Sequence, residues 1–269
     1  MSFSYPQRIC CLTEETTEIL YRLGEEDRIV GISGFTVRPE QARREKPKVS
    51  AFVEADIPKI EALKPDLILA FSDIQANITR ELIARGHAVF TFNQRSVAEI
   101  LNTLVWVSAL VGRQADGEEL AHSMRRRLDA IEDRTRAHSL RPRIYFEEWP
   151  DPMITGIGWV SELIEVAGGV DVFSDLGKES LATHRIVEPG RVVERQPDGI
   201  IGSWCGKKVR LDQIQSRAGW EEVPAVRRGC LYDLNSSLIL QPGLAALTDG
   251  VDELERIINE VREATPVGA

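Results

Sequence analysis

Short apolar runs and amphipathic stretches alternate along the chain. The apolar runs are typical of buried strands in a parallel sheet, and the amphipathic stretches repeat with the period of a helix. In the first part of the chain, this pattern predicts strands at Arg8–Leu12, Ile29–Gly31, Lys48–Val49, Leu67–Phe71 and Ala88–Phe92. It predicts helices over Glu14–Leu23, from Asp56 to Pro65 and over Gln75–Arg85, the first of them capped by Thr13 or by Thr16 or Thr17.

The same alternation returns after residue 140. Strands are predicted at Arg143–Phe146, Gly199–Gly202 and Leu231–Leu234. Helices are predicted over Gly158–Ala167, Glu188–Arg195, Asp212–Ser216 and Gly243–Val261. Strands that alternate with helices at these lengths indicate βα repeats, so the predicted fold class is α/β with mainly parallel sheets.

Two helical segments, Ser96–Val111 and Gln114–Leu140, separate these parts. A narrow apolar stripe runs along the longer segment at spacings of four, four and three residues: Leu120, Met124, Leu128 and Ile131. The rest of its surface is charged, and we interpret Arg125–Arg127 as part of a solvated face. A helix of about 25 residues is roughly 37 Å long. We therefore predict an N-terminal lobe (1–95), connecting and backbone helices (96–140) and a C-terminal lobe (141–269).

The two lobes resemble one another in sequence. Residues 56–70 read DIPKIEALKPDLILA and residues 188–202 read EPGRVVERQPDGIIG, each with an acidic residue, a helix, Pro-Asp and an apolar strand. Residues 17–24 (TEILYRLG) pair in the same way with residues 161–168 (SELIEVAG). Two such pairs in the same order favour an internal duplication.

Composition excludes some classes of function. The net charge of −9 and a pI near 5.2 argue against a nucleic-acid partner, which would require a basic face. No run of 18 apolar residues occurs, so we expect no membrane-spanning segment. Residues 1–7 lack the basic start and apolar core of a secretory signal, which predicts a cytoplasmic location, or a periplasmic one if a leader was removed. We expect a monomer. Adjacent Cys10 and Cys11 are poor candidates for a mutual bridge, and the cysteines favour a reducing compartment.

No strong catalytic motif is present. The sequence has no P-loop, no HExxH and no CxxC, and Gly156-Ile157-Gly158 fails the dinucleotide fingerprint because Ser161 replaces its third glycine. We therefore expect no enzymatic activity and no intrinsic cofactor. The alternative from another class is a cytoplasmic metal-dependent enzyme or metallochaperone that uses Cys205 with Glu148 or His184.

Large aromatic side chains follow several predicted strands. Ligands of open parallel sheets bind beyond the carboxyl ends of the strands, so these positions predict a site for a big, flat, partly apolar ligand. The candidate contacts of the first lobe are Thr13, Phe35, Phe52, Phe71, Ser72 and Asn93. Those of the second lobe are Glu148, Trp149, Trp159, Trp204, Cys205, Lys207 and Gln241.

A structural role is an alternative for several of these candidates. Phe71 suits a sheet core as well as a ligand site, and Trp159 is evenly balanced between the two. Trp149 and Trp204 stand in polar loops containing Gly or Pro, which favours exposure. We expect Trp106 and Trp220 to be structural.

The order of these motifs resembles a known family. Segments 16–24, 28–31 and 60–68 are similar to the first lobe of the iron-chelate and vitamin B12 binding proteins of ABC importers, and segments 159–169 and 196–201 are similar to the second. Residues 145–149 (YFEEW) favour the cobalamin-binding branch.

The resemblance implies two α/β lobes joined by one long helix, with the ligand in the cleft between the lobes. It also implies an ABC permease as partner. We predict non-catalytic binding of a corrinoid, either cobalamin or a precursor, for uptake or salvage. A ferric siderophore or other metal chelate is the alternative ligand, although the candidate contacts are poor in the arginines and tyrosines that an anionic chelate requires.

Overall fold

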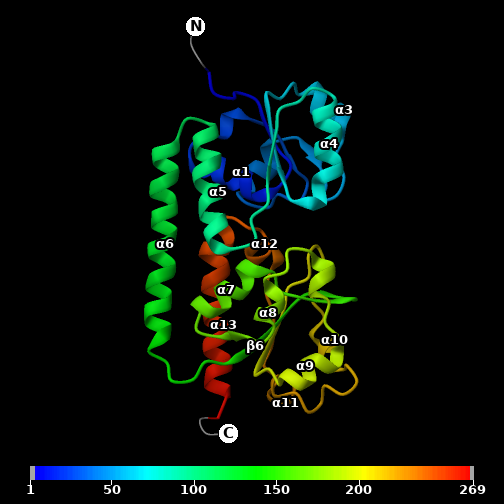
Figure 1. Ribbon diagram of the computed structural model, residues 1–269, viewed down its shortest axis with the longest axis vertical. Coiled ribbons are helices and arrows are strands. Elements are labelled where there is room, and N and C mark those ends of the chain that lie inside the picture. The colour runs from blue at the N-terminus through cyan, green and yellow to red at the C-terminus, as the bar shows by residue number, and fades with distance from the viewer. Residues whose placement is uncertain (1–3, 267–269) are drawn as a thin grey trace. The chain divides into compact units, whose positions relative to one another are not determined.

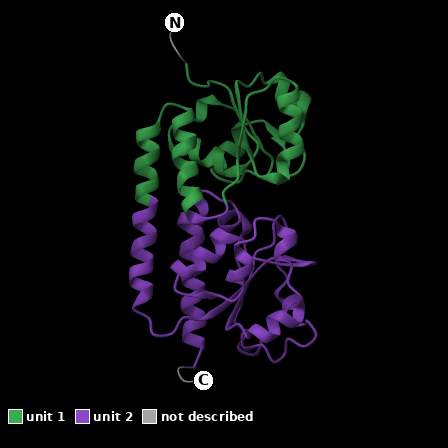
Figure 2. Cartoon of the chain, viewed as in Figure 1, with its two compact units in different colours: residues 1–94, 98–123 green, residues 95–97, 124–269 purple. Residues whose placement is uncertain are grey.

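The computed structural model describes residues 4–266 (Figure 1). Residues 1–3, which belong to the segment compared with a secretory signal, lie outside the described residues. Two compact units are present: unit 1 comprises residues 1–94 and 98–123, and unit 2 comprises residues 95–97 and 124–269 (Figure 2). The division falls within the long helix α6 (Gln114–Arg136), whose residues are shared between the units.

Unit 1 contains a five-stranded sheet in the order β3-β2-β1-β4-β5, with all pairs parallel. Its strands are β1 (Ile9–Cys11), β2 (Ile29–Ser33), β3 (Lys48–Ser50), β4 (Leu67–Phe71) and β5 (Val89–Phe92). The chain moves outward from β1 to β3 and then returns to the other side of β1. The strand order therefore reverses between β1 and β4, which is the point where open α/β sheets bind ligands.

The helices of unit 1 connect these strands. They are α1 (Glu14–Arg22), α2 (Glu40–Glu45), α3 (Ile57–Ala62), α4 (Ala76–Ala84) and α5 (Val97–Leu110), together with the first part of α6 and the 3-10 turns η1 (Glu26–Arg28) and η2 (Asp73–Gln75). A core cluster forms between the sheet and the α3–α4 region; among its members are Cys10, Val49, Ile60, Ile68 and Leu82. Burial raises the pKa of the Cys10 and Cys11 thiols to about 12, so neither is a reactive thiolate.

The sheet of unit 2 is built around β6 (Arg143–Pro150). The strand order is β10-β9-β6-β7, with β7 (Met153–Thr155) antiparallel to the end of β6 and β8 (Val170–Asp171) parallel to its start. The remaining strands are β9 (Gly199–Gly202) and β10 (Leu231–Asp233). Here the order reverses between β6 and β9, so their carboxyl ends form the second switch point.

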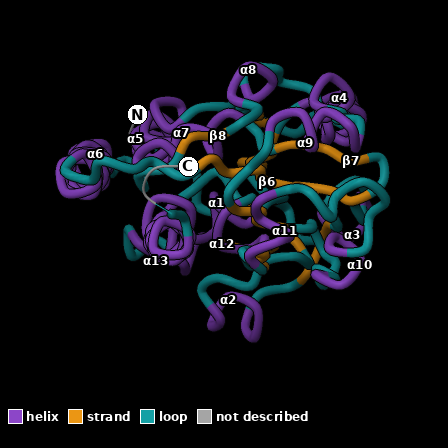
Figure 3. The backbone as a smooth tube through the Cα atoms, turned by 90° about the horizontal axis from the view of Figure 1, so that it is seen from below, coloured by secondary structure: helices purple, strands orange, loops and turns teal. Residues whose placement is uncertain are grey.

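Helices cover both sides of this sheet (Figure 3). They are α7 (Gly158–Val166), α8 (Ser174–Gly177), α9 (Pro189–Arg195), α10 (Leu211–Gln215), α11 (Pro224–Arg228), α12 (Ser236–Ile239) and α13 (Val251–Ala264), with the turn η3 (Ala182–Arg185). The π-helical turn η4 (Ala246–Gly250) leads directly into α13. The apolar face of α13, including Leu254, Ile257 and Ile258, is buried.

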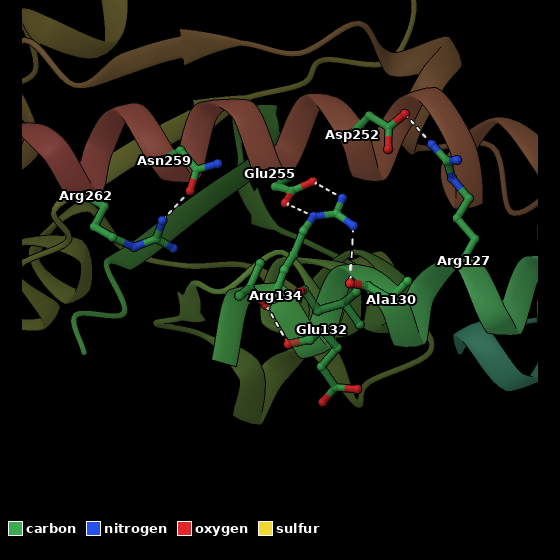
Figure 4. A network of polar contacts seen from close by, with 10 residues as sticks. Arg127, Ala130, Glu132, Arg134, Asp252, Glu255, Asn259 and Arg262 are labelled. Atoms are coloured by element: carbon green, nitrogen blue, oxygen red, sulfur yellow. Dashed lines mark hydrogen bonds and ion pairs between the residues drawn. The ribbon is translucent and has the colours of Figure 1, made fainter. Parts of the chain in front are cut away.

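Ion pairs join α13 to the second part of α6 (Figure 4). Arg134 forms two hydrogen bonds with Glu255, at 2.6 and 2.5 Å, and a third with the carbonyl of Ala130 in its own helix. Arg127 pairs with Asp252. The face interpreted from sequence as solvated therefore contributes, through Arg127, to a charged seam between two helices.

The structure corrects the sequence-based boundaries at several places. The strand predicted to end at Phe146 continues to Pro150 because β7 pairs with its second half. The helix predicted over Gly243–Val261 begins as a π-helical turn at Ala246. Thr13 stands at the N-cap of α1, but its hydroxyl donates to the Glu15 carboxylate rather than capping a backbone N–H. The short helices α2 and α11 were not predicted.

Candidate functional site

The carboxyl end of β1 in unit 1 carries three buried polar residues, Thr13, Glu14 and Glu15. The Thr13 hydroxyl donates to the Glu15 carboxylate at 2.6 Å. Burial, followed by repulsion from neighbouring carboxylates, raises the pKa of Glu14 to about 8, and burial raises that of Glu15 to about 7. Glu14 therefore retains its proton at neutral pH, and Glu15 titrates close to neutral pH.

Gln75 ties the strand ends of unit 1 together. Its buried side-chain amide donates to the carbonyls of Leu12 and Phe52, both at 3.2 Å, and its oxygen accepts the backbone N–H of Phe71 at 3.0 Å. The sequence indicated only a helix start at this position. An amide that satisfies three segments distant in sequence has no local signature, so only the fold identifies it.

Two aromatic rings follow β2 and β3. Phe35 is 44% exposed, and its ring meets the half-buried ring of Phe52 edge to face with 6.4 Å between centroids. The two loops are joined by a 2.7 Å hydrogen bond from the Gly34 N–H to the Ser50 carbonyl. Val37 and Val53, in the same two loops, are also exposed.

Ser72 and Asn93 follow β4 and β5. Ser72 has φ +58° and ψ −179°, a conformation that favours glycine, so its backbone is strained. Both residues line an open cavity of about 550 Å³ along α4. Its other lining residues are Asp73, Ala76, Thr79, Arg80, Ile83 and Thr91. Phe71, by contrast, is buried and belongs to the core, as does Phe92.

In unit 2, Glu147 is the centre of a buried polar cluster at the end of β6. The carboxylate is 0% exposed, and Arg217 donates to both of its oxygens, at 2.5 and 3.0 Å. It also accepts the indole N–H of Trp204 at 3.1 Å and the hydroxyl of Tyr145 at 3.1 Å. The guanidinium of Arg217 lies over the ring of Trp220, 4.7 Å from its centroid.

Glu148 has its own arginine. Side chains of successive strand residues point to opposite faces, so Glu148 meets a different segment from Glu147. Arg185, whose side chain is 2% exposed, donates to Glu148 at 2.6 and 3.2 Å and also to the carbonyl of Thr155 in β7. Neither Arg185 nor Arg217 was among the predicted site residues. The adjacent carboxylates of Glu147 and Glu148 were the only sequence feature to indicate that two cations are needed here.

Trp149 and Lys207 are brought together by the fold. The Lys207 ammonium lies 4.1 Å from the centroid of the Trp149 ring, and the indole N–H of Trp149 donates to the Asp151 carbonyl at 2.9 Å. Cys205, half-buried, lies between Trp204 and Lys207 in the turn after β9. In that turn Gly206 has φ +70°, where a residue with a side chain would be strained.

The exposure predicted for Trp204 is wrong, because only 3% of this residue is exposed and its indole N–H donates to the Glu147 carboxylate. Trp159 is equally buried and donates to the Ile239 carbonyl at 2.9 Å, so a structural role is assigned to it. Gln241 is half-buried after α12. Trp106, expected to be structural, is 49% exposed on α5.

Residues 4–266 contain no group of three or more His, Cys, Asp or Glu side chains arranged to hold a metal ion. His184 is exposed and contacts the Glu179 carboxylate at 3.3 Å. Over the same residues, none of the helices combines the length and apolar character needed to cross a bilayer.

Curated relatives match nearly the full chain. An uncharacterized ABC transporter substrate-binding lipoprotein of Bacillus subtilis is 26% identical over 262 residues, covering 94% of this chain and 80% of the relative. A vitamin B12-binding protein of Vibrio cholerae is 29% identical over 254 residues, covering 92% and 87%.

Solved structures share the fold. A possible iron-binding, periplasmic solute-binding protein of Staphylococcus epidermidis matches with a TM-score of 0.80 at 23% identity, covering 95% of this chain and 99% of the other. The periplasmic vitamin B12-binding protein of Vibrio cholerae matches with a TM-score of 0.76 at 24% identity, covering 97% and 100%. A heme-binding protein of Roseiflexus gives 0.81 at 20% identity, covering 96% and 99%.

These matches confirm the α/β class and the resemblance seen in the sequence. The chain is a substrate-binding protein of the ABC-transporter type, and such proteins bind their substrates without transforming them. Residues 9–238 match the sequence profile of the periplasmic binding proteins, and the chain belongs to that family.

Proposed function

We propose that this protein binds a corrinoid, cobalamin or a precursor, and delivers it to an ABC permease. The observation that carries the proposal is the chemistry at the carboxyl ends of the strands in the two sheets. Aromatic rings, Phe35 and Phe52 in unit 1 and Trp149 in unit 2, lie at or beyond these strand ends. The two buried arginines of unit 2 are compensated by Glu147 and Glu148. A corrinoid suits such surroundings because it presents a large apolar ring system edged by neutral amides.

Charge compensation argues against a polyanionic chelate. A ferric siderophore carrying several negative charges requires several unpaired cations. The two arginines of the unit 2 site are neutralised by Glu147 and Glu148, and in unit 1 the Arg38 guanidinium pairs with Glu18 at 3.0 Å. The buried carboxyl groups of Glu14 and Glu15 add no positive charge. The relative from Vibrio cholerae that is named for vitamin B12 favours the same ligand.

The heme-binding structures make heme the competing ligand. Heme carries two propionates and usually requires a His, Tyr, Cys or Met side chain on its iron. Of the predicted contacts, only Cys205 offers such a group. Competition between hemin and cyanocobalamin for the protein would separate the two ligands directly.

Calorimetric titration with cyanocobalamin, followed in parallel by absorbance, tests the proposal. We expect saturable binding with one ligand per chain and at least a tenfold loss of affinity in Phe35→Ala, because a pocket aromatic burying about 100 Å² contributes on the order of 2.5 kcal/mol. Trp106→Ala is the matched control, since this ring is equally exposed but lies on α5. Absence of heat and of spectral change at tens of micromolar ligand would refute the corrinoid.

The compartment stays a prediction. The family is named for the periplasm and one relative is a lipoprotein, whereas four cysteines that form no disulfide are typical of a reducing environment. Fractionation of cells that express the native gene, with thiol labelling of each fraction, distinguishes these locations.

A further inference from the structure

The unit 2 site has one fixed cation more than its carboxylates compensate. Glu147 pairs with Arg217 and Glu148 with Arg185, so these four side chains sum to zero charge. Lys207 remains, and among the described residues no carboxylate lies within ion-pairing distance of its ammonium group. An aromatic face attracts a cation but carries no net charge, so it leaves that excess in place.

The position of this cation is constrained by the ring beneath it and by the turn that carries it. The Trp149 ring beneath it is oriented by the 2.9 Å hydrogen bond to the Asp151 carbonyl. The backbone N–H of Lys207 donates to the Trp204 carbonyl at 3.2 Å, and Trp204 is anchored in turn on Glu147. The ammonium group therefore rests on a fixed ring at the end of a short, anchored turn, while the residue stays exposed.

The contact with Lys207 changes the surface that Trp149 presents to a ligand. With the ammonium 4.1 Å from its centroid, one face of the ring is occupied and unavailable to a flat ligand. A ligand approaching that face meets positive charge in place of an aromatic surface.

Resting on the proposed corrinoid function, we propose that Lys207 on Trp149 binds a singly anionic group of the ligand. Within the corrinoids, that group is the phosphodiester that links the lower nucleotide base to the ring. The protein is therefore specific for complete corrinoids over those that lack the nucleotide. A phosphodiester carries one negative charge, which a single fixed ammonium matches.

The test compares cyanocobalamin with dicyanocobinamide, which lacks the phosphodiester and the base. We expect wild-type protein to bind cyanocobalamin about tenfold more tightly, and added salt to weaken only that complex. In Lys207→Met the preference should fall to about twofold through loss of cyanocobalamin affinity alone. Lys207→Arg should restore it, because a guanidinium keeps both the charge and the ring contact.

Lys208→Met is the matched control and should leave both affinities unchanged, since among the described residues Lys208 contacts no aromatic ring. Equal affinities in the wild type would overturn the inference while leaving corrinoid binding intact. A preference that survives in Lys207→Met would also overturn it, because the base would then be recognised elsewhere. Failure to bind either compound would instead overturn the proposed function. Circular dichroism and the melting temperature verify that each variant is folded.

Discussion

Asp66 and Asp198 make the same contact in their separate units. The Asp66 carboxylate accepts the backbone N–H of Arg8 at 2.8 Å, and the Asp198 carboxylate accepts that of Arg143 at 3.0 Å. Each arginine also donates its guanidinium to a carbonyl at the end of the helix that precedes the aspartate, Leu63 or Arg195.

The backbone repeats as well. Two residues before each aspartate, Lys64 and Gln196 adopt positive φ angles of 48° and 43°. Similar local geometry around the two Pro-Asp sequences supports the duplication inferred from them, because chance similarity of sequence would not reproduce a left-handed residue and a side-chain clamp together.

Removing either carboxylate should destabilise its own unit. A hydrogen bond to a charged group contributes about 1.5–3 kcal/mol, so Asp66→Asn and Asp198→Asn should each lower the melting temperature by several degrees. Asp198→Asn should cost more, because Asp198 also pairs with Arg228 at 3.0 Å. Asp133→Asn, at an exposed position on α6, is the control for calorimetry and should change little. Equal melting temperatures for all three variants would contradict the clamp.

The protonated carboxyl of Glu14 predicts a dependence of stability on pH. Its folded-state pKa, about 8, is above the ordinary value of 4.5, so the folded state binds more protons between these values. Its contribution is complete below about pH 4.5 and is lost as the pH rises through 8. Burial causes the shift, Glu15 and Glu18 reinforce it, and Arg43 opposes it.

Glu14→Gln mimics the protonated form and should remove this dependence. We expect the variant to match the wild type near pH 5 and to exceed it by a few kcal/mol near pH 9, at about 1.4 kcal/mol per unit of pKa difference. Denaturant titrations at both pH values provide the measurement, with Glu54→Gln as an exposed control. A constant difference between variant and wild type across the range would disprove the assignment.

The buried ion pair predicts an asymmetric response to truncation. Arg217→Met leaves the Glu147 carboxylate buried without a cation, which should cost about 3–5 kcal/mol and loosen the turn that Trp204 anchors. Arg217→Met with Glu147→Gln should recover much of that loss. The control is Arg228→Met. Arg228 pairs with Asp198 and is more exposed than Arg217, so its loss should destabilise the protein less. If the double variant is no more stable than Arg217→Met in urea unfolding, the charge is not the cause.

Close packing of α5 on the first part of α6 predicts a steric effect. A Cβ at Gly117 would collide with the side chain of Ser108, so Gly117→Ala should destabilise unit 1 by about 1–3 kcal/mol. Adding Ser108→Gly should recover part of this by clearing the space. Gly190→Ala, where a Cβ would meet nothing within 4 Å, should be neutral or slightly stabilising. Differential scanning calorimetry measures all four proteins, and equal effects at the two glycines would rule out the close approach.

The sequence by itself determined the α/β class, the internal repeat and the positions of most strands. These follow from local causes: apolar runs such as Leu67–Phe71, Asp56 followed by proline at a helix start, and glycines such as Gly24 and Gly86 with positive φ at helix ends. Each cause acts within a few residues, so the linear pattern records it.

Only the tertiary structure decided which candidate side chains are exposed enough to contact a ligand. Trp204 and Phe71 were judged by their loops and strand ends, yet their burial depends on partners distant in sequence. Arg217 meets Glu147 across 70 residues and Arg185 meets Glu148 across 37, and neither pairing leaves a local signal. The charge that a ligand encounters is set by those long-range pairings, because a compensated arginine and a free lysine look alike in a sequence and differ only in the fold.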